Sequence, residues 1–388
     1  MVYLDHAATT PLRPEAVSAM QACLDEAGEF ANPASGHAPG RRAARLLEEA
    51  RERFAAVIGA SPAELVFTSG ATESNNLALL GAAAFYGDER PRIVMPKTEH
   101  KSVLDPCRQL AGRGFRLHHP PLDAEGVLTP EALVQALDKT AGLAACMLVN
   151  NETGVIQNIP AMAQACQERQ VILHVDAAQA LGKLPIHCRR WGVGMMSFSA
   201  HKFGGPKGIG ALYLRRKPAV RVQPLVYGGG HEQGLRLGTV ALHQIVAMVA
   251  AAEAAVTEQE REFARLAGLR EALWQQLDAA LPGLLRNGSS QQQAPHILNI
   301  SFEGVDGEAL RADLPELALS SGSACTSANA ESSYVLRALG RNDALADASL
   351  RFSFGTTTTA ADIKSAAEQV IRAVRRLRRL SPLWEAAA

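Results

Sequence analysis

The stretch Ser197-Phe-Ser-Ala-His-Lys202 places a lysine at the end of an apolar strand, beside a histidine and two serines. Far downstream, Ser320-Ser-Gly-Ser-Ala-Cys325 places a cysteine in a run of small residues. A lysine in such a position can form a Schiff base with a carbonyl cofactor, and a cysteine thiolate is a strong nucleophile. Together the two stretches indicate carbonyl-cofactor chemistry followed by attack from a thiolate.

Around the first stretch, apolar runs that look like strands alternate with helical patterns. We expect strands at Leu65–Thr68, Arg92–Met95, Ala145–Val149, Val171–Val175 and Met195–Phe198, and a returning strand at Ile209–Leu214. Strands separated by helices predict an α/β fold with a mostly parallel sheet that is covered on both faces. A polar cluster follows most of these runs, at the edge where open α/β sheets bind their ligands.

A helical stretch from about Leu242 to Glu262 is predicted to lead into a second, smaller domain. We expect a large cofactor-binding domain at residues 15–257 and a small α+β domain at residues 1–14 and 258–388 that carries Cys325. In the small domain, the predicted strands are Ile297–Phe302 and Leu350–Phe354, and the predicted last helix is Ile363–Leu380.

The basic run Arg372 to Arg379 lies in this last helix. Contact with RNA is one interpretation. The favoured one is the solvated face of an amphipathic helix whose apolar residues face inward, namely Val370, Val374, Leu377 and Leu380.

Composition excludes few classes of protein, but it indicates the compartment and the kinds of partner to expect. The 388 residues suit two domains, and the 39 Lys+Arg balance the 39 Asp+Glu, so net charge gives no reason to expect nucleic acid or a membrane as partner. The start of the chain shows no signal-peptide pattern. Six cysteines without a CxxC pair favour a reduced, cytoplasmic setting, and five of them are predicted to be buried as small apolar residues: Cys23, Cys107, Cys146, Cys166 and Cys188.

Two clusters could bind a phosphorylated ring. Residues 67–74, Phe-Thr-Ser-Gly-Ala-Thr-Glu-Ser, read as a strand, a turn and a helix start, which suits a phosphate; the alternative is an ordinary N-cap by Thr72 or Ser74. Asp176 follows an apolar strand and could pair with a pyridinium nitrogen, with Gln179 near the phenolic oxygen of the ring. The alternative is that Asp176 caps the next helix.

Three further side chains are candidates for chemistry. His100 could stack on a planar ring and move protons, although an ordinary hydrogen-bonded histidine is the alternative. Lys202 follows a strand, whereas the nearby Lys207 reads as an exposed loop lysine. Cys325 has no apolar neighbours that would pack it, so a reactive role is favoured over a structural one.

Taken together, these stretches resemble a pyridoxal-phosphate enzyme of fold type I in the class V aminotransferase superfamily, and more narrowly the cysteine desulfurases of the NifS/IscS type. The resemblance runs from residues 3–11, Tyr-Leu-Asp-His-Ala-Ala-Thr-Thr-Pro, through residues 149–154, 174–179 and 199–202, to residues 320–327 and 380–385. It implies a seven-stranded, mostly parallel sheet flanked by helices, with a smaller α+β domain, and conversion of L-cysteine to L-alanine.

The resemblance also implies roles for single residues. Lys202 would bind the cofactor covalently and move the Cα proton, His100 would stack on the ring, Asp176 would pair with its nitrogen and Gln179 would contact its phenolic oxygen. Asn151 and Arg351 would hold the substrate carboxylate, and Cys325 would become the persulfide. The phosphate would be held by Ala71, Thr72, Ser199, His201 and, from the second subunit of a homodimer, Thr239.

Partners follow from the same resemblance. The persulfide sulfur would pass to an acceptor protein, either an iron–sulfur scaffold or a sulfur relay protein. No metal of its own is expected, although Cys325 could transiently ligate a cluster on a partner. The chain ends at Ala388, soon after Trp384, so docking through the longer tail of many relatives is not expected. The rival functions are an aminotransferase, a selenocysteine lyase and a catalytically dead scaffold dimer.

Overall fold

A seven-stranded sheet forms the centre of the larger part of the molecule. The computed structural model describes the chain except for residues 88, 322–331, 382–383 and 385–388. The strand order is β2-β8-β7-β6-β5-β3-β4, and only β8 runs against the others. The strands are β2 (Leu65–Thr68), β3 (Arg92–Val94), β4 (Arg116–His118), β5 (Ala141–Met147), β6 (Ile172–Asp176), β7 (Met195–Ser199) and β8 (Gly210–Leu214). The predicted mostly parallel sheet and its returning strand are confirmed.

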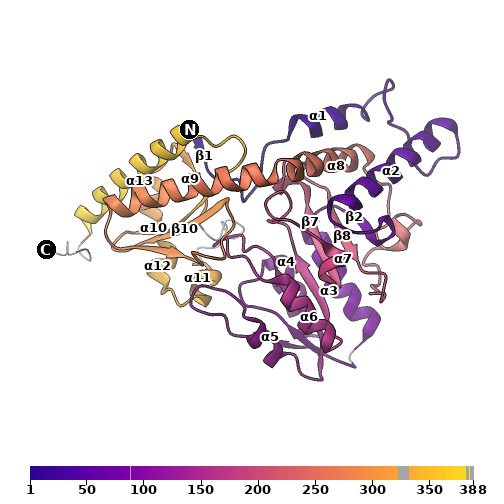
Figure 1. Ribbon diagram of the computed structural model, residues 1–388, viewed down its shortest axis with the longest axis horizontal. Coiled ribbons are helices and arrows are strands. Elements are labelled where there is room, and N and C mark those ends of the chain that lie inside the picture. The colour runs from indigo at the N-terminus through magenta and orange to yellow at the C-terminus, as the bar shows by residue number, and fades with distance from the viewer. Residues whose placement is uncertain (88, 322–331, 382–383, 385–388) are drawn as a thin grey trace.

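Helices cover both faces of this sheet (Figure 1). Alternate residues of each strand point to opposite faces, so one apolar core lies on each side. One core includes residues of α1 (Pro14–Gln21), α2 (Ala38–Val57), α5 (Pro130–Ala136), α6 (Ile159–Glu168) and α8 (Leu242–Thr257). The other lies against α3 (Ala71–Tyr86) and α4 (Lys101–Ala111). The short helices are η1 (Pro62–Glu64), α7 (Cys188–Trp191), η2 (Ala200–Lys202) and η3 (Glu232–Gly234).

A second, smaller part has its own sheets and its own core. An antiparallel sheet has the order β12-β10-β9, and a parallel pair joins β1 to β11. The strands are β1 (Val2–Tyr3), β9 (Leu284–Asn287), β10 (Ile297–Phe302), β11 (Leu317–Ala318) and β12 (Ser349–Ser353). Figure 1 shows α13 (Ala360–Leu380) lying alongside α9 (Gln259–Ala280) over this part. The remaining helices are α10 (Gly307–Ala312), α11 (Tyr334–Ala338) and α12 (Asp343–Asp347).

The predicted linking helix is two helices. A break at Glu258 separates α8, which packs in the larger part, from the long α9. The predicted strand at Ala145 begins earlier, at Ala141, because small residues extend the buried run. The boundary placed at residues 257 and 258 stays a prediction.

The last helix departs from its predicted pattern at its end. Val370 and Val374 are buried as expected, but Leu380 is 70% exposed and Arg378 is 5% exposed. The Arg378 guanidinium donates to the carbonyl oxygens of Pro282 and Glu303 and lies 3.9 Å from the Trp384 ring. The predicted solvated face is therefore wrong at Arg378, which binds buried carbonyl groups instead.

The five cysteines predicted to be structural are all buried and free of disulfides. Burial raises the pKa of each of their thiols above the ordinary value. They are therefore thiols, poor nucleophiles, at neutral pH. Within the described ranges, no helix has the length and apolar character needed to cross a membrane.

A buried ion pair ties the loop after β8 to the sheet. Arg51 of α2 donates to Glu232 at 2.6 Å, and the Glu232 carboxylate also accepts from the backbone N–H of Phe67 on β2 at 2.7 Å. The side chains of Arg51 and Glu232 are 9% and 1% exposed. Removing either partner would leave a charge in an apolar setting.

We predict that Glu232→Ala lowers the free energy of unfolding by about 3 to 5 kcal/mol, because Arg51 is left buried and unneutralised by its main partner. The matched control is Glu48→Ala, which removes the exposed partner of the same arginine, at 3.4 Å. That control should lose no more than about 1 kcal/mol. Urea denaturation of both variants measures the difference, and equal losses would contradict the prediction.

Candidate active site

A cavity of about 540 Å³ lies at the carboxyl ends of the parallel strands. Segments that follow β2, β3, β5, β6 and β7 line it, together with the N-terminal strap, which we define as residues 5–10. The predicted site residues that line this cavity are Ala71, Thr72, His100, Asn151, Asp176, Gln179, Ser199, His201, Lys202 and Arg351. A larger cavity of about 1010 Å³ lies at the amino ends of β5 and β6, and no predicted site residue that the structure describes lines it.

The amino end of α3 forms one corner of the cavity. Gly70 is the N-cap of α3 with a φ of 148°, and residues 69–73 line the cavity. Strand β8 passes directly behind this corner, because a Cβ on Gly210 would lie 2.6 Å from the Cα of Gly70. The first N–H groups of a helix have no partner within it, so this corner suits a phosphate.

The alternative for this corner, an N-cap by Thr72 or Ser74, is wrong. Gly70 occupies the N-cap position, and the Ser74 hydroxyl lies 2.7 Å from Oγ1 of Thr68 instead. Thr72 is exposed at the cavity, so its hydroxyl is placed to contact a ligand.

Ser199 is the last residue of β7, His201 lies two residues further on, and both line the same cavity. Nδ1 of His201 lies 3.2 Å from Oγ1 of Thr9. Burial, together with the charges of Lys202 and Lys207, lowers the pKa of His201 to about 4. The imidazole is therefore neutral at neutral pH, and the positive charge that lines the cavity here belongs to the two lysines.

Lys202 is held against the N-terminal strap. Its Nζ donates to the carbonyl oxygens of Ala7 at 2.5 Å and Ala8 at 2.8 Å. The strap is fixed in turn, because the backbone N–H of Thr10 donates to the carbonyl of His201 at 3.0 Å. The amine is thus positioned at the cavity by main-chain groups.

Asp176 ends β6 with both carboxylate oxygens engaged. Oδ1 accepts from the backbone N–H of Ala178 at 2.9 Å, and Oδ2 accepts from Nδ2 of Asn75 at 2.8 Å. Nε2 of His174 lies 2.8 Å from the other end of that amide, and burial lowers the pKa of His174 to about 4. The hydrogen bond from Ala178 is of the kind that the capping alternative predicts. However, turns follow Asp176 in place of a helix, so Asp176 does not cap one.

Gln179 and His100 have partners beside the cavity as well. Gln179 donates from Nε2 to the carbonyl of Ala7 at 2.8 Å. His100 is the N-cap of α4, where its Nδ1 accepts from the backbone N–H of Ser102 at 3.1 Å. The alternative reading of His100 as a hydrogen-bonded residue is thus realised, while its ring also lines the cavity.

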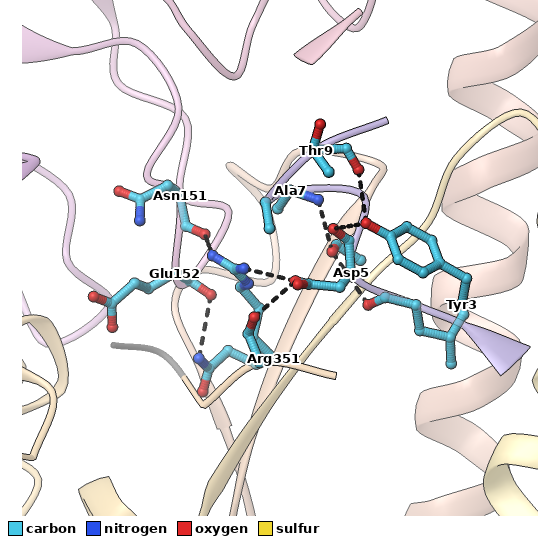
Figure 2. A network of polar contacts seen from close by, with 12 residues as sticks. Tyr3, Asp5, Ala7, Thr9, Asn151, Glu152 and Arg351 are labelled. Atoms are coloured by element: carbon cyan, nitrogen blue, oxygen red, sulfur yellow. Dashed lines mark hydrogen bonds and ion pairs between the residues drawn. The ribbon is translucent and has the colours of Figure 1, made fainter. Parts of the chain in front are cut away.

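Arg351 reaches the cavity from β12 and is 2% exposed. Figure 2 shows its guanidinium between the main chain of Asn151 and the carboxylate of Asp5. Nη1 donates to the Asn151 carbonyl at 2.8 Å, and Nη2 pairs with Oδ1 of Asp5 at 2.8 Å. Among the described residues, Nε of Arg351 and Oδ1 of Asn151 have no hydrogen-bond partner. Both of these atoms are buried, and both residues line the cavity.

Two predicted residues are not part of this arrangement. Thr239 is exposed and does not line the cavity. Cys325 lies outside the described residues. The part of the chain that the structure describes contains no group of three His, Cys, Asp or Glu side chains that could hold a metal ion.

Sequence reasoning missed several residues that hold the predicted ones. Asp5 pairs with Arg351, Asn75 binds Asp176, and the carbonyl groups of Ala7 and Ala8 hold Lys202. Asp5 lies in the quoted N-terminal stretch, which was the one available signal. Asn75 is a buried amide on a helix, and nothing in its local pattern marks it.

The family comparison agrees with this geometry. The family model described as aminotransferase class-V matches residues 2–365, so the chain belongs to that family. A relative from Salmonella arizonae named cysteine desulfurase IscS is 49% identical over 385 residues, which cover 99% of this chain and 95% of that one.

Comparison with solved structures also finds proteins of this kind. A structure titled NifS-like protein has a TM-score of 0.89 at 32% identity and covers 97% of this chain and 100% of its own. Another, titled SspA in complex with cysteine, has a TM-score of 0.79 at 33% identity and covers 91% of this chain and 99% of its own. Within the class V family, the chain belongs with the cysteine desulfurases of the NifS/IscS type.

A buried carboxyl beside His100 gives a pH-dependent prediction. Glu99 is 1% exposed, its Oε1 accepts from the backbone N–H of Met147 at 2.8 Å, and burial raises its pKa to about 8. An unfolded chain releases this proton near the ordinary pKa of 4.5, so the folded protein loses stability as the pH rises from about 4.5 to about 8.

We predict that Glu99→Gln removes this loss, because the amide keeps the bond to Met147 and has no proton to release. The free energy of unfolding of the variant minus that of the unmodified protein should increase by roughly 1 to 4 kcal/mol as the pH is raised from 5 to 8.5. Urea denaturation at both pH values measures the gain, with the exposed Glu131→Gln as control. An equal pH dependence in all three proteins would show that Glu99 ionises normally.

Proposed function

We propose that this chain removes the sulfur of L-cysteine, releases L-alanine, and keeps the sulfur as a persulfide on Cys325. The observation that carries the proposal is the single cavity that Lys202, Asp176, His100 and Arg351 line together. The reaction balances without an outside oxidant: the Cβ–S bond of L-cysteine breaks, an S–S bond forms between its sulfur and Sγ of Cys325, and Cβ takes a proton to give L-alanine.

Pyridoxal 5′-phosphate fits the residues of this cavity. The amino end of α3 suits its phosphate, with Ala71, Thr72, Ser199 and His201 around it. The Asp176 carboxylate, held by two N–H donors, suits its ring nitrogen. Gln179 would contact the phenolic oxygen and His100 would stack on the ring. When bound, the cofactor withdraws electrons from the substrate Cα and so makes its proton acidic.

The chain's own groups supply the remaining steps. Lys202, held at the cavity by the carbonyls of Ala7 and Ala8, would anchor the cofactor and afterwards take the Cα proton on Nζ. His100 would exchange protons at the substrate. Arg351 would bind the substrate carboxylate through its remaining N–H groups, with Asn151 beside it. The Cys325 thiolate would attack the substrate sulfur.

The proposal extends to a homodimer, an acceptor protein and a cytoplasmic location. Thr239 is exposed and away from the cavity of its own chain, which suits contact with the phosphate in a second subunit. The outer sulfur of a persulfide can be transferred to another protein. The proposed partner is therefore a protein that accepts this sulfur, such as an iron–sulfur scaffold or a sulfur relay protein. The free, buried cysteines suit a reduced compartment.

We predict that Lys202→Ala abolishes alanine release while it still binds the cofactor through the phosphate corner. Reduction with borohydride should link the cofactor covalently to the unmodified protein and not to the variant. The exposed Lys364→Ala is the control and should behave as the unmodified protein. A Lys202→Ala enzyme with normal turnover would refute the role of this lysine.

We predict that Cys325→Ser binds cofactor and L-cysteine with a visible spectral change but releases no alanine, because a hydroxyl does not accept the sulfur. Mass spectrometry of the unmodified enzyme should find the persulfide on Cys325. The control Cys23→Ala should release alanine normally. Persulfide on one of the five buried cysteines would assign the nucleophile elsewhere, and amino-group transfer to a keto acid would favour an aminotransferase.

A further inference from the structure

His174 is a buried polar residue of the central sheet that the proposed reaction does not use. It lies on β6 two residues before Asp176, so the two side chains project from the same face of the strand. Leu173 and Val175 project from the opposite face and belong to the apolar core on that side of the sheet. On the face of His174, Asn75 of α3 contacts both the imidazole and the Asp176 carboxylate.

Both ends of the Asn75 amide have hydrogen-bond partners. Asn75 is 0% exposed, so these partners come from the protein and not from bulk water. At one end, Nδ2 donates to Oδ2 of Asp176 and to Oγ of Ser102, in each case at 2.8 Å. At the other end, Oδ1 lies 2.8 Å from Nε2 of His174.

The proton of His174 lies on Nε2. An amide oxygen only accepts hydrogen bonds, so Nε2 has to donate to Oδ1 of Asn75. Burial lowers the pKa of His174 to about 4, and the ring is therefore neutral at neutral pH and has a single N–H. Among the described residues, Nδ1 has no hydrogen-bond partner. A proton on Nδ1 would be buried without an acceptor, which is unfavourable, whereas a proton on Nε2 has one.

His174 thereby sets the direction of the Asn75 amide. With the amide turned by half a rotation, its N–H groups would face the N–H of His174 and its oxygen would face the carboxylate of Asp176. Ser102 does not distinguish the two directions, because a hydroxyl both donates and accepts. The imidazole is thus the partner that favours an N–H group, and not an oxygen, against Asp176.

The result is a carboxylate whose two oxygens both face N–H donors. Oδ1 of Asp176 accepts from the backbone N–H of Ala178 at 2.9 Å, and Oδ2 accepts from Asn75. A proton on this carboxyl group would compete with these donors, so Asp176 is held as an acceptor. Asp176 also lines the proposed cofactor cavity, and there an acceptor suits a ring nitrogen that carries a proton.

We propose that His174 and Asn75 are positioning residues that hold Asp176 as a hydrogen-bond acceptor, so that the cavity selects a ring whose nitrogen carries a proton. Neither residue lines the cavity, and both therefore act through Asp176. The inference rests on the proposed function, because it concerns recognition of the ring of pyridoxal 5′-phosphate.

The test compares the binding of two ligands to the cofactor-free protein, namely pyridoxal 5′-phosphate and its analogue in which a C–H group replaces the ring nitrogen. The unmodified protein should bind pyridoxal 5′-phosphate more tightly. Asn75→Leu, which keeps the size of the side chain without its N–H groups, should bind pyridoxal 5′-phosphate roughly tenfold more weakly. Its affinity for the analogue should fall by less than about threefold, because the analogue offers Asp176 no N–H group.

Two outcomes of this comparison would overturn the proposal. An equal loss of affinity for both ligands in Asn75→Leu would indicate general damage to the cavity. Equal affinities of the unmodified protein for both ligands would show that the cavity does not select the ring nitrogen.

Variants of His174 test the direction of the amide while Asn75 stays in place. His174→Gln keeps an N–H donor near the position of Nε2 and should bind pyridoxal 5′-phosphate within about threefold of the unmodified protein. His174→Leu has no donor and should lose roughly as much affinity as Asn75→Leu. The control is Asn76→Leu, because this adjacent asparagine is exposed and donates to the Thr72 carbonyl of its own helix at 2.9 Å. Equal affinities of the two His174 variants would refute the role of His174.

A second readout needs no ligand. Because the backbone N–H of Ala178 donates to Asp176, its hydrogen exchange reports whether the carboxylate keeps its place. In the cofactor-free protein, this exchange should be faster in Asn75→Leu and unchanged in Asn76→Leu. Unchanged exchange in Asn75→Leu would contradict the positioning of Asp176. An unmodified enzyme that releases no alanine would refute the proposed function instead, and the binding and exchange measurements would still decide the positioning.

Discussion

The parallel run of the central strands is the constraint on which the site depends. Because β2, β5, β6 and β7 end at one edge of the sheet, the residues that follow them meet there, although they are far apart in the sequence. The corner proposed for the phosphate, Asp176 and Lys202 all lie at this edge. Their spacing is set by the separation of neighbouring strands and not by any local motif.

The sheet supplies only part of the site, and the N-terminal strap supplies the rest. Ala7 and Ala8 hold Lys202 through their carbonyls, the carbonyl of Ala7 also accepts from Gln179, and Asp5 holds Arg351. One short stretch thus contacts both the groups proposed to bind the cofactor and the group proposed to bind the substrate. Because the residues proposed to hold the cofactor and the arginine proposed to hold the substrate share one support, they keep a fixed geometry relative to each other.

The sequence could predict those parts of the site that follow strand ends. Asp176 and Lys202 each follow an apolar run, so both the strand and the residue after it were readable. Asn75 and Asp5 were not, because their roles depend on partners brought near by the fold. The family resemblance gave roles to single residues, and the structure shows that most of these residues line one cavity.

The difference between what a local pattern records and what the fold brings together also explains the end of α13. Apolar periodicity correctly placed Val370 and Val374 in the core, but it treated every arginine as solvated. Arg378 instead binds carbonyl groups of the loops around Pro282 and Glu303, and its charge lies over Trp384. A pattern of hydrophobicity does not record which carbonyl groups lack a donor, and so it could not mark this arginine.

The contacts of the strap also determine when the enzyme can become complete. Asp5 and Ala7 contact Arg351 and Ser353, each of which is synthesised 346 residues after its partner. The strands of the central sheet are closer together in the sequence, so the sheet can fold before the strap makes these contacts, as domains generally fold during synthesis. The N-terminal strap therefore cannot make these contacts until β12 has been synthesised. A product truncated before β12 would keep Lys202 but would lack the arginine and the serine that the strap requires.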